Sequence, residues 1–196
     1  MREVIDVEKL DPDFKYEIAK EPGGEMIMRC FACGTCSAGC PVREIDDGYN
    51  PRKIIRMALL GMKDKVLESD FIWQCAHCYQ CHQRCPQDVR FTDIIGAMRS
   101  LAIKDAKKKG KRIKAPGYVF ARSFMTCTEL FGKVWEPALL PLFFLGTANL
   151  KGLIDYMPLG MKFFPKGKIR VIPPVPLVGT SSKVRNIKKR AEEANK

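Results

Sequence analysis

The chain has 196 residues, of which 46% are hydrophobic and 29% charged, a balance typical of globular proteins and not of disordered ones. Its formal net charge of +12 suggests nucleic acid as a partner. Its nine cysteines, beside only two histidines, suggest metal instead. No stretch reaches the about 18–20 apolar residues of a membrane-spanning helix, so the sequence predicts no such span.

Residues 1–25 form an acidic segment with eight acidic and four basic side chains. The positive charge of the chain therefore lies in the residues that follow this segment. The first residues, MREVIDVEKLDPDF, contain no apolar stretch of the kind found in secretory signals, so we expect a cytoplasmic location.

Eight of the nine cysteines fall in two short groups with the same spacing, C-x2-C-x2-C-x3-C-P. The first group consists of Cys30, Cys33, Cys36 and Cys40, followed by Pro41, and the second of Cys75, Cys78, Cys81 and Cys85, followed by Pro86. Every cysteine of the second group lies 45 positions after its counterpart in the first. The chain therefore contains an internal repeat of a metal-binding unit.

This spacing is the one found in bacterial ferredoxins that carry two [4Fe–4S] clusters. Three thiolates two residues apart can surround one side of a compact cluster, and the proline after the fourth cysteine turns the chain away. In those ferredoxins the fourth cysteine ligates the other cluster. We therefore predict two [4Fe–4S] clusters with crossed ligation, one held by Cys30, Cys33, Cys36 and Cys85, and the other by Cys75, Cys78, Cys81 and Cys40.

Two other uses of these cysteines are disfavoured. Disulfide bonds need an oxidising compartment, which the expected location does not offer. Zinc sites commonly separate two pairs of ligands by a longer finger, and four cysteines within eleven residues leave no such finger. Both loops also contain small residues that let backbone amides approach cluster sulfurs, namely Gly34, Ala38, Gly39 and Ala76.

The residues between the two motifs are predicted to be helical. Asn50 suits the N-cap of a helix and Pro51 its first position, apolar residues then recur at helical spacing, and Gly61 suits its end. Shorter helices are expected over residues 63–69 and 70–75.

After the second motif, Thr92 is expected to cap a longer helix with an apolar stripe, which closes at a run of lysines before Gly110. The clusters would then sit in loops between helices. Residues 26–110 are therefore predicted to form an alpha-helical ferredoxin domain, within a mainly α protein.

Residues 103–114 contain seven basic residues and one acidic residue. A solvated helix end is favoured here over docking against an acidic partner. Nucleic acid is the least favoured, because no helix-turn-helix or aromatic support lies nearby.

Residues 111–170 are predicted to be a helical extension that serves core packing or docking to a partner, with packing favoured. Its apolar run at 138–145 is too short to span a membrane and contains Pro141. Residues 171–196 are predicted to be an extended, basic tail, because they begin with a proline-rich stretch. The polar, basic end of this tail, from residue 183 onward, is predicted to be helical at most.

Five further residues are of interest near the motifs. With four thiolates for each cluster, His77 and His82 are not needed as ligands, and a solvated or packing role is favoured over tuning the neighbouring cluster. Cys127 is expected to be a small buried apolar side chain. Trp73 and Tyr79 are expected to shield the second cluster from water, and exposure to water shifts the potential of such clusters.

The order of these features resembles the C subunit of the heterodisulfide reductases of methanogenic archaea. The likeness is strongest over residues 26–105 and especially in residues 72–81, IWQCAHCYQC. It implies an alpha-helical ferredoxin fold with two [4Fe–4S] loops and a helical or extended C-terminal region.

The resemblance also implies an electron-transfer role in a soluble oxidoreductase complex. The C subunit of such a complex passes electrons from the flavin- and cluster-containing A subunit to the B subunit, which reduces the heterodisulfide of coenzyme M and coenzyme B. The B subunit carries adjacent Cys-Cys pairs, and none occurs in this sequence, so a non-catalytic role without a substrate site is implied. A hydrogenase or formate dehydrogenase module is a further partner in the larger complex that the resemblance allows.

The same helical module occurs in the iron–sulfur subunits of succinate dehydrogenase and fumarate-type enzymes, and of glycolate and glycerol-3-phosphate oxidoreductases. Motif spacing alone does not separate these, so another flavoprotein oxidoreductase remains the alternative. Two thiolate-bound clusters would lower the net charge to roughly +8. The remaining positive charge is best explained by docking and by compensation of the anionic clusters.

Overall fold

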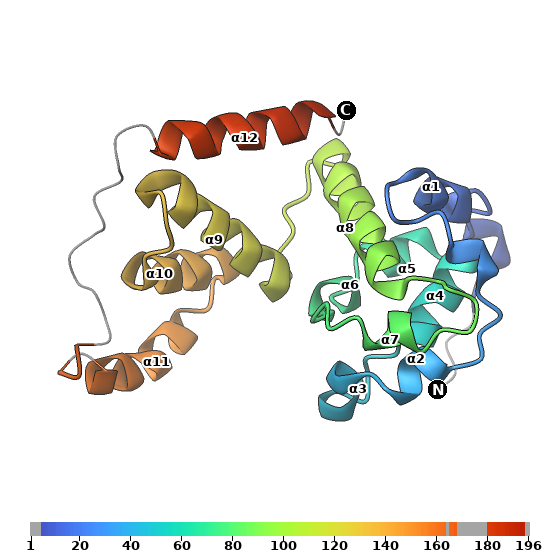
Figure 1. Ribbon diagram of the computed structural model, residues 1–196, viewed down its shortest axis with the longest axis horizontal. Coiled ribbons are helices and arrows are strands. Elements are labelled where there is room, and N and C mark those ends of the chain that lie inside the picture. The colour runs from blue at the N-terminus through green and yellow to red at the C-terminus, as the bar shows by residue number, and fades with distance from the viewer. Residues whose placement is uncertain (1–4, 164, 168–179, 195–196) are drawn as a thin grey trace. The chain divides into compact units, whose positions relative to one another are not determined.

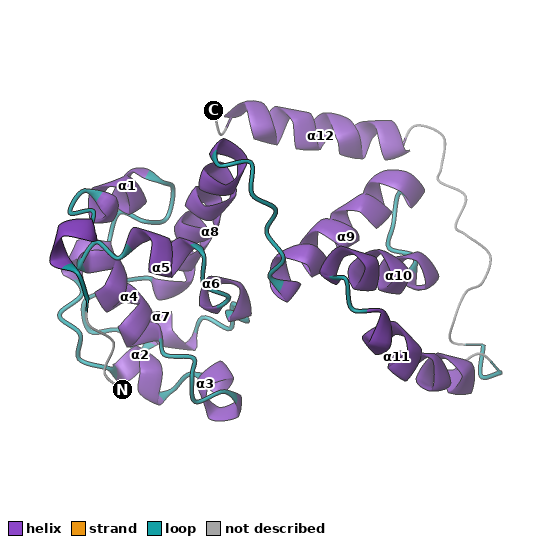
Figure 2. Cartoon of the chain, turned by 180° about the vertical axis from the view of Figure 1, so that it is seen from behind, coloured by secondary structure: helices purple, strands orange, loops and turns teal. Residues whose placement is uncertain are grey.

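The computed structural model describes residues 5–163, 165–167 and 180–194, and within these ranges the chain forms helices and no strand (Figures 1 and 2). The mainly α architecture predicted from the sequence is confirmed. The chain divides into two compact units, Met1–Ile113 and Lys114–Lys196, which are described one at a time.

The first unit holds both cysteine motifs and is built from short helices and one long one. Its two 3-10 helices are Val7–Lys9 and Ile27–Arg29. Its α-helices are α1 (Phe14–Lys20), α2 (Thr35–Ala38), α3 (Pro41–Ile45), α4 (Pro51–Leu59), α5 (Lys63–Leu67), α6 (Phe71–Gln74), α7 (Gln80–Gln83) and α8 (Phe91–Lys108).

The core of the first unit lies where α1, α4, α5, α6 and α8 meet (Figure 1). Its fully buried side chains include Phe14, Ile18, Ile54, Ile55, Val66, Ile72, Ile94, Ile95 and Met98. Five of the eight motif cysteines pack against the edge of this core, namely Cys30, Cys40, Cys75, Cys81 and Cys85. Burial of the apolar side chains, at about 25 cal/mol per Å², therefore also holds the two loops in place.

Helix α4 has the boundaries that its sequence predicts. Asn50 is its N-cap, and its Oδ1 atom accepts a hydrogen bond from the backbone N–H of Lys53 over 3.1 Å. Gly61 follows the end of the helix with a φ of +81°, a conformation that glycine adopts without strain. The short helices expected over residues 63–69 and 70–75 are also present, as α5 and α6.

Helix α8 begins differently from the prediction. Its N-cap is Arg90 in the left-handed conformation, and Thr92 lies inside the helix, so the expectation that Thr92 caps it is wrong. Phe91, the first helical residue, is buried in the core, and this packing sets the start of the helix in place of a capping side chain. The predicted apolar stripe is confirmed by the buried Ile94, Ile95, Met98 and Ala102.

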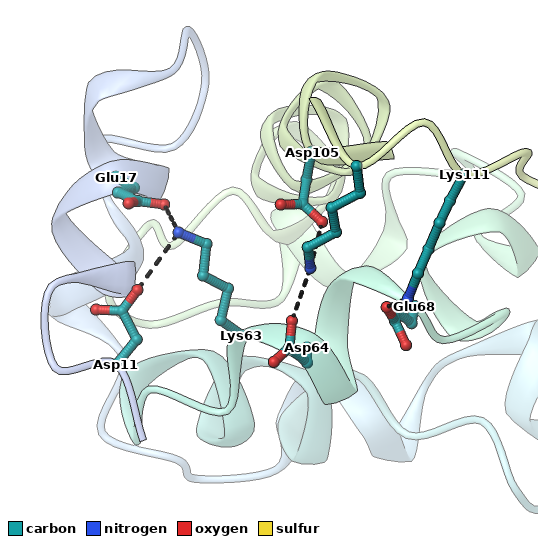
Figure 3. Close-up of polar contacts among 8 residues, drawn as sticks. Asp11, Glu17, Lys63, Asp64, Glu68, Asp105 and Lys111 are labelled. Carbon is teal, nitrogen blue, oxygen red and sulfur yellow. Dashed lines mark hydrogen bonds and ion pairs between the residues drawn. The ribbon is translucent and has the colours of Figure 1, made fainter. Parts of the chain in front are cut away.

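The acidic segment at the start of the chain is tied to α5. The ammonium group of Lys63 lies 2.6 Å from Glu17 and 3.3 Å from Asp11 (Figure 3). The backbone N–H of Asp11 also donates a hydrogen bond to the carbonyl of Gly61 over 2.9 Å. Although burial alone would lower the pKa of Lys63, these two carboxylates outweigh it and raise that pKa.

The basic run at the end of α8 is largely exposed, as the solvated helix end favoured from the sequence requires, and three of its seven basic residues, Lys104, Lys109 and Lys111, also form ion pairs within the first unit. Lys109 lies 2.8 Å from Asp105 and 3.0 Å from Asp64, while Lys111 lies 2.7 Å from Glu68 (Figure 3). Asp64 lies in α5, and Glu68 directly follows that helix. The lysines therefore join α5 to the end of α8, an arrangement that long-range contacts create and local sequence does not reveal.

The second unit consists of α9 (Pro116–Phe131), α10 (Glu136–Thr147), α11 (Leu150–Phe163) and α12 (Thr180–Ala194). Aromatic contacts join the first three: the ring centroids of Phe120 and Phe143 lie 6.0 Å apart, and those of Phe144 and Tyr156 lie 5.7 Å apart. Helix α12 is held to α9 by an ion pair of 2.6 Å between Lys188 and Glu129.

Over Thr180–Ala194 the tail forms α12, so its basic end takes the helical form that the sequence allowed at most. The proline-rich stretch expected to be extended lies outside the described residues. In the part of the chain that the structure describes, we find no helix with both the length and the apolar content to cross a membrane.

Candidate iron–sulfur centres

The two cysteine loops have the same backbone shape. The residues on either side of Cys33, Ala32 and Gly34, have positive φ values of 62° and 92°, and their counterparts His77 and Tyr79 have values of 52° and 61°. Each loop then continues into one turn of helix, α2 in the first repeat and α7 in the second. Left-handed backbone at non-glycine residues costs about 1–3 kcal/mol each, and such strain gathers at functional sites.

The first loop and the end of the second line one cavity of about 420 Å³, which includes space open to solvent. Its wall contains Cys30, Cys33 and Cys36 from the first repeat, and Cys81 and Cys85 from the second. The rest of the wall is mostly small or apolar, with Ala32, Gly34, Ile55, Val89 and Phe91 among its residues. Four of these cysteines are the predicted ligands of one cluster.

A second cavity of about 310 Å³ lies beside the second loop. Its wall contains Cys75, Cys78 and Cys81 from the second repeat, together with Cys40 from the first. These four are the predicted ligands of the other cluster. Tyr49, Phe91 and Thr92 complete much of the remaining wall.

The two fourth cysteines each lie beside the loop of the other repeat. Cys40 lines the cavity of the second repeat, and Cys85 lines that of the first. Cys40 is also the N-cap of α3, whose first residue is Pro41, so the chain leaves the cavity directly after this thiol. Cys81 lines both cavities, which are therefore immediate neighbours.

Nearby donors face several of the sulfurs. The backbone N–H of Val89 donates a hydrogen bond to the sulfur of Cys85 over 3.3 Å. The hydroxyl of Thr35 lies 3.3 Å from the sulfur of Cys33, and that of Thr92 lies 3.7 Å from the sulfur of Cys81. Such groups stabilise thiolates and tune the potentials of the clusters that thiolates hold.

The thiols respond to their surroundings in different ways. The hydrogen bond from Thr35 lowers the pKa of the exposed Cys33. Burial, together with repulsion from the neighbouring thiolates of Cys30 and Cys81, raises the pKa of Cys36 to about 11. Burial also raises the pKa of Cys81, next to Cys75 and Cys78. Because neighbouring thiolates repel one another, a cationic centre among them would stabilise their charges. Soft thiolate ligands suit the iron of iron–sulfur clusters.

Arg99 is a residue of this site that the sequence analysis missed. Its guanidinium donates hydrogen bonds to the carbonyls of Ile72, over 2.6 Å, and Cys75, over 3.1 Å, and lies over the ring of Trp73. Burial lowers its pKa. An arginine on an apolar helix face is the only sequence signal that singles it out. It fixes the start of the second motif and places a positive charge beside the second cavity.

The other residues near the motifs have the following environments. Nδ1 of His77 lies 3.2 Å from the carbonyl oxygen of Cys75, and Nε2 of His82 lies 3.3 Å from Asp88. Tyr79 lines the second cavity and is 46% exposed. Cys127 is fully buried in α9, and burial raises its pKa.

Comparisons with known proteins identify the family. Residues 26–89 match the family described as a 4Fe-4S dicluster domain. A Methanocaldococcus jannaschii protein, named as a C-type (C 2) iron-sulfur subunit of CoB–CoM heterodisulfide reductase, is 36% identical over 151 residues, which cover 70% of this chain and 80% of that protein. The chain belongs to the family of heterodisulfide reductase C subunits.

Two further members of this family match over a shorter length. The C-type iron-sulfur subunit of the Methanopyrus kandleri CoB–CoM heterodisulfide reductase is 40% identical over 119 residues, covering 57% of this chain and 59% of the relative. A Methanococcus maripaludis protein is named as the C2 subunit of an H(2)/formate:CoB-CoM heterodisulfide,ferredoxin reductase. It is 42% identical over 106 residues, which cover 50% of this chain and 56% of that protein. The two predicted [4Fe–4S] clusters are confirmed, and the glycolate, glycerol-3-phosphate and fumarate-type alternative is not favoured.

Proposed function

We propose that this chain is the electron-transfer subunit of a heterodisulfide reductase complex and carries electrons between two neighbouring [4Fe–4S] clusters. Cys30, Cys33, Cys36 and Cys85 hold one cluster, and Cys40, Cys75, Cys78 and Cys81 hold the other. The observation that carries the proposal is the pair of cysteine-lined cavities with Cys81 in the wall of both. Clusters bound there would be close enough to exchange electrons within one chain.

Electrons enter from the flavin-containing A subunit and leave to the B subunit, which reduces the CoM–CoB heterodisulfide. The name of the Methanococcus maripaludis relative, which includes H(2) and formate, supports a hydrogenase or a formate dehydrogenase module as the upstream donor. No two cysteines adjoin in the sequence, which supports a non-catalytic role for this chain. The thiol-rich cavities suit the reducing conditions of the cytoplasm, where we place this activity.

The second unit provides a docking surface for the neighbouring subunits. The apolar side chains of Leu145 and Ile154 are each 63% exposed, and that of Leu130 is 58% exposed. Exposed apolar side chains of this size on neighbouring helices are typical of interaction sites. Leu145→Gln should therefore weaken co-purification of the complex without lowering its iron content, whereas Lys151→Gln, at an exposed position of α11, should leave both unchanged.

Metal analysis of anaerobically purified protein tests the cluster assignment. We expect about eight iron and about eight acid-labile sulfide per chain. Zinc in place of iron would refute it.

The route of the electrons is tested in the reconstituted complex. Reduction of the B subunit by the reduced A subunit should depend on the wild-type chain and fail with Cys78→Ala. The matched control is Cys127→Ala, which removes a cysteine that lines neither cavity. Equal rates with and without the chain would refute the route while leaving the cluster content unaffected.

A further inference from the structure

Tyr49 carries a buried hydroxyl without a partner. It precedes the N-cap of α4, its side chain is 1% exposed, and its hydroxyl oxygen makes no hydrogen bond to any described residue. Buried hydroxyl groups nearly always have a partner, because leaving one without a hydrogen bond costs free energy. An unpaired group of this kind calls for an acceptor that is present when the protein works.

The surroundings of Tyr49 identify that acceptor. Tyr49 lines the second cavity together with Cys40, Cys75 and Cys81. Burial, followed by the charge and the sulfur of Cys75, raises the pKa of Tyr49 well above its ordinary value. A phenol carries its proton at neutral pH and can donate it toward the sulfurs around it.

We propose that the Tyr49 hydroxyl donates a hydrogen bond to the Cys75 sulfur when the second cavity holds its cluster, and that it raises the reduction potential of that cluster alone. This inference rests on the proposed ligand set, in which Cys75 is a ligand of the second cluster. Reduction adds one negative charge to a cluster, and a hydrogen bond to a ligand sulfur stabilises that added charge. The same hydrogen bond stabilises the oxidised cluster less, so the reduction potential of the second cluster rises.

The first cavity lacks this donor. The residue 45 positions after Tyr49 is Ile94, whose apolar side chain is buried in the core. The polar groups in the first wall come from Thr35, Arg52 and Gln87, and no tyrosine is among its residues. The repeat therefore has one cluster site with a buried phenol and one without. Tyr49 therefore raises the potential of the second cluster and has no counterpart that acts on the first.

The test compares Tyr49→Phe with Tyr16→Phe, the same substitution at an exposed tyrosine that lines neither cavity. Redox titration of the whole chain by electron paramagnetic resonance measures both midpoint potentials. In Tyr49→Phe the ratio of reduced to oxidised second cluster at fixed potential should fall by about tenfold, which is about 59 mV for a one-electron couple. Tyr16→Phe should leave both potentials unchanged.

The signal of the second cluster is identified with Cys78→Ser, which alters only the cluster that Cys78 ligates. An unchanged potential in Tyr49→Phe, or a change in the other cluster, would overturn the inference. Iron content separates this from failure of the proposed function, since about eight iron per chain in the wild type and in Tyr49→Phe leaves the ligand assignment standing.

A second measurement covers the case in which Tyr49→Phe does not retain its clusters. Incorporation of 3-fluorotyrosine into the Tyr79→Phe chain strengthens the donor at position 49 and keeps the ring almost the same size. The potential of the second cluster should then rise, and no rise would refute the hydrogen bond.

Discussion

The hydroxyl of Ser37 donates a hydrogen bond of 2.7 Å to the Oδ1 atom of Asn50. Ser37 is buried within the first cysteine motif, and Asn50 is the N-cap of α4. The same serine oxygen accepts a hydrogen bond from the backbone N–H of Arg52 over 2.9 Å. The first cluster loop is therefore fastened to the start of α4 by a small buried polar network.

Removing either side of this network should destabilise the protein. We expect Ser37→Ala to lower the free energy of unfolding by about 1–3 kcal/mol, because it leaves buried partners unsatisfied. Asn50→Ala should cost about 1 kcal/mol through loss of the cap. The double variant should lose less than the sum, with a coupling energy of at least about 0.5 kcal/mol. Anaerobic denaturation of the cluster-loaded chain measures the free energy of unfolding of the two single variants and the double variant. If the losses of the single variants add up to that of the double variant, the two side chains do not cooperate.

Crossed ligation predicts that each fourth cysteine supports the cluster of the other repeat. Cys40→Ala should disturb the same spectroscopic signal as Cys78→Ser, and Cys85→Ala the same signal as Cys33→Ser. Electron paramagnetic resonance and iron analysis under anaerobic conditions provide the measurement. If Cys40→Ala instead altered the signal that Cys33→Ser alters, ligation would lie within each repeat.

Two glycines are expected to respond to alanine in opposite directions. At Gly61, with φ of +81°, an added Cβ atom would overlap the carbonyl oxygen of Asp11, so Gly61→Ala should cost at least about 2 kcal/mol. At Gly96, in the exposed middle of α8, no atom lies within 4 Å of the added Cβ. Gly96→Ala should therefore stabilise the chain by about 0.5–1 kcal/mol. Thermal unfolding compares the two, and equal effects would contradict the packing at Gly61.

The Lys63 ion pairs predict a dependence of stability on pH. Because the pKa of Lys63 is raised in the folded state above the ordinary 10.5, its contribution is complete below that value and is lost as the pH rises through the folded pKa. At about pH 8 the wild type should be more stable than Lys63→Met by about 0.5–1 kcal/mol. The difference should shrink as the pH rises above 10.5 and through the raised pKa of Lys63.

Lys53→Met, at an exposed position of α4, is the control for this measurement and should show no such trend. Denaturant unfolding across the pH range provides the data. A difference between wild type and Lys63→Met that grows with pH would contradict the assignment of the ion pairs.

Local patterns predicted the parts of the fold that local interactions determine. Asn50 and Pro51 mark the start of α4 because a cap acts within one turn of helix. The start of α8 was missed because burial of Phe91 outweighs the capping preference of Thr92. Instead, the hydroxyl of Thr92 faces the sulfur of Cys81, a contact across eleven positions.

The cysteine spacing predicted the four cysteines that line the second cavity and four of the five that line the first, since that spacing reflects the chemistry of the cofactor itself. The unpaired hydroxyl of Tyr49 and the hydrogen bonds of Arg99 could not be predicted. Both depend on which residues the folded core brings to the second cavity, and nothing in the sequence near either residue records that neighbourhood.

The presence of cysteines from both repeats in each wall has a consequence for biosynthesis. A nascent chain that has emerged only as far as α5 contains all four thiols of the first repeat, yet the first wall still lacks Cys81 and Cys85. Under the proposed ligation the first site needs Cys85, and the second needs Cys75, Cys78 and Cys81, so neither cluster can be fully ligated before the second motif has left the ribosome. With these ligand sets the repeat is a duplication in sequence but a single unit in cofactor assembly.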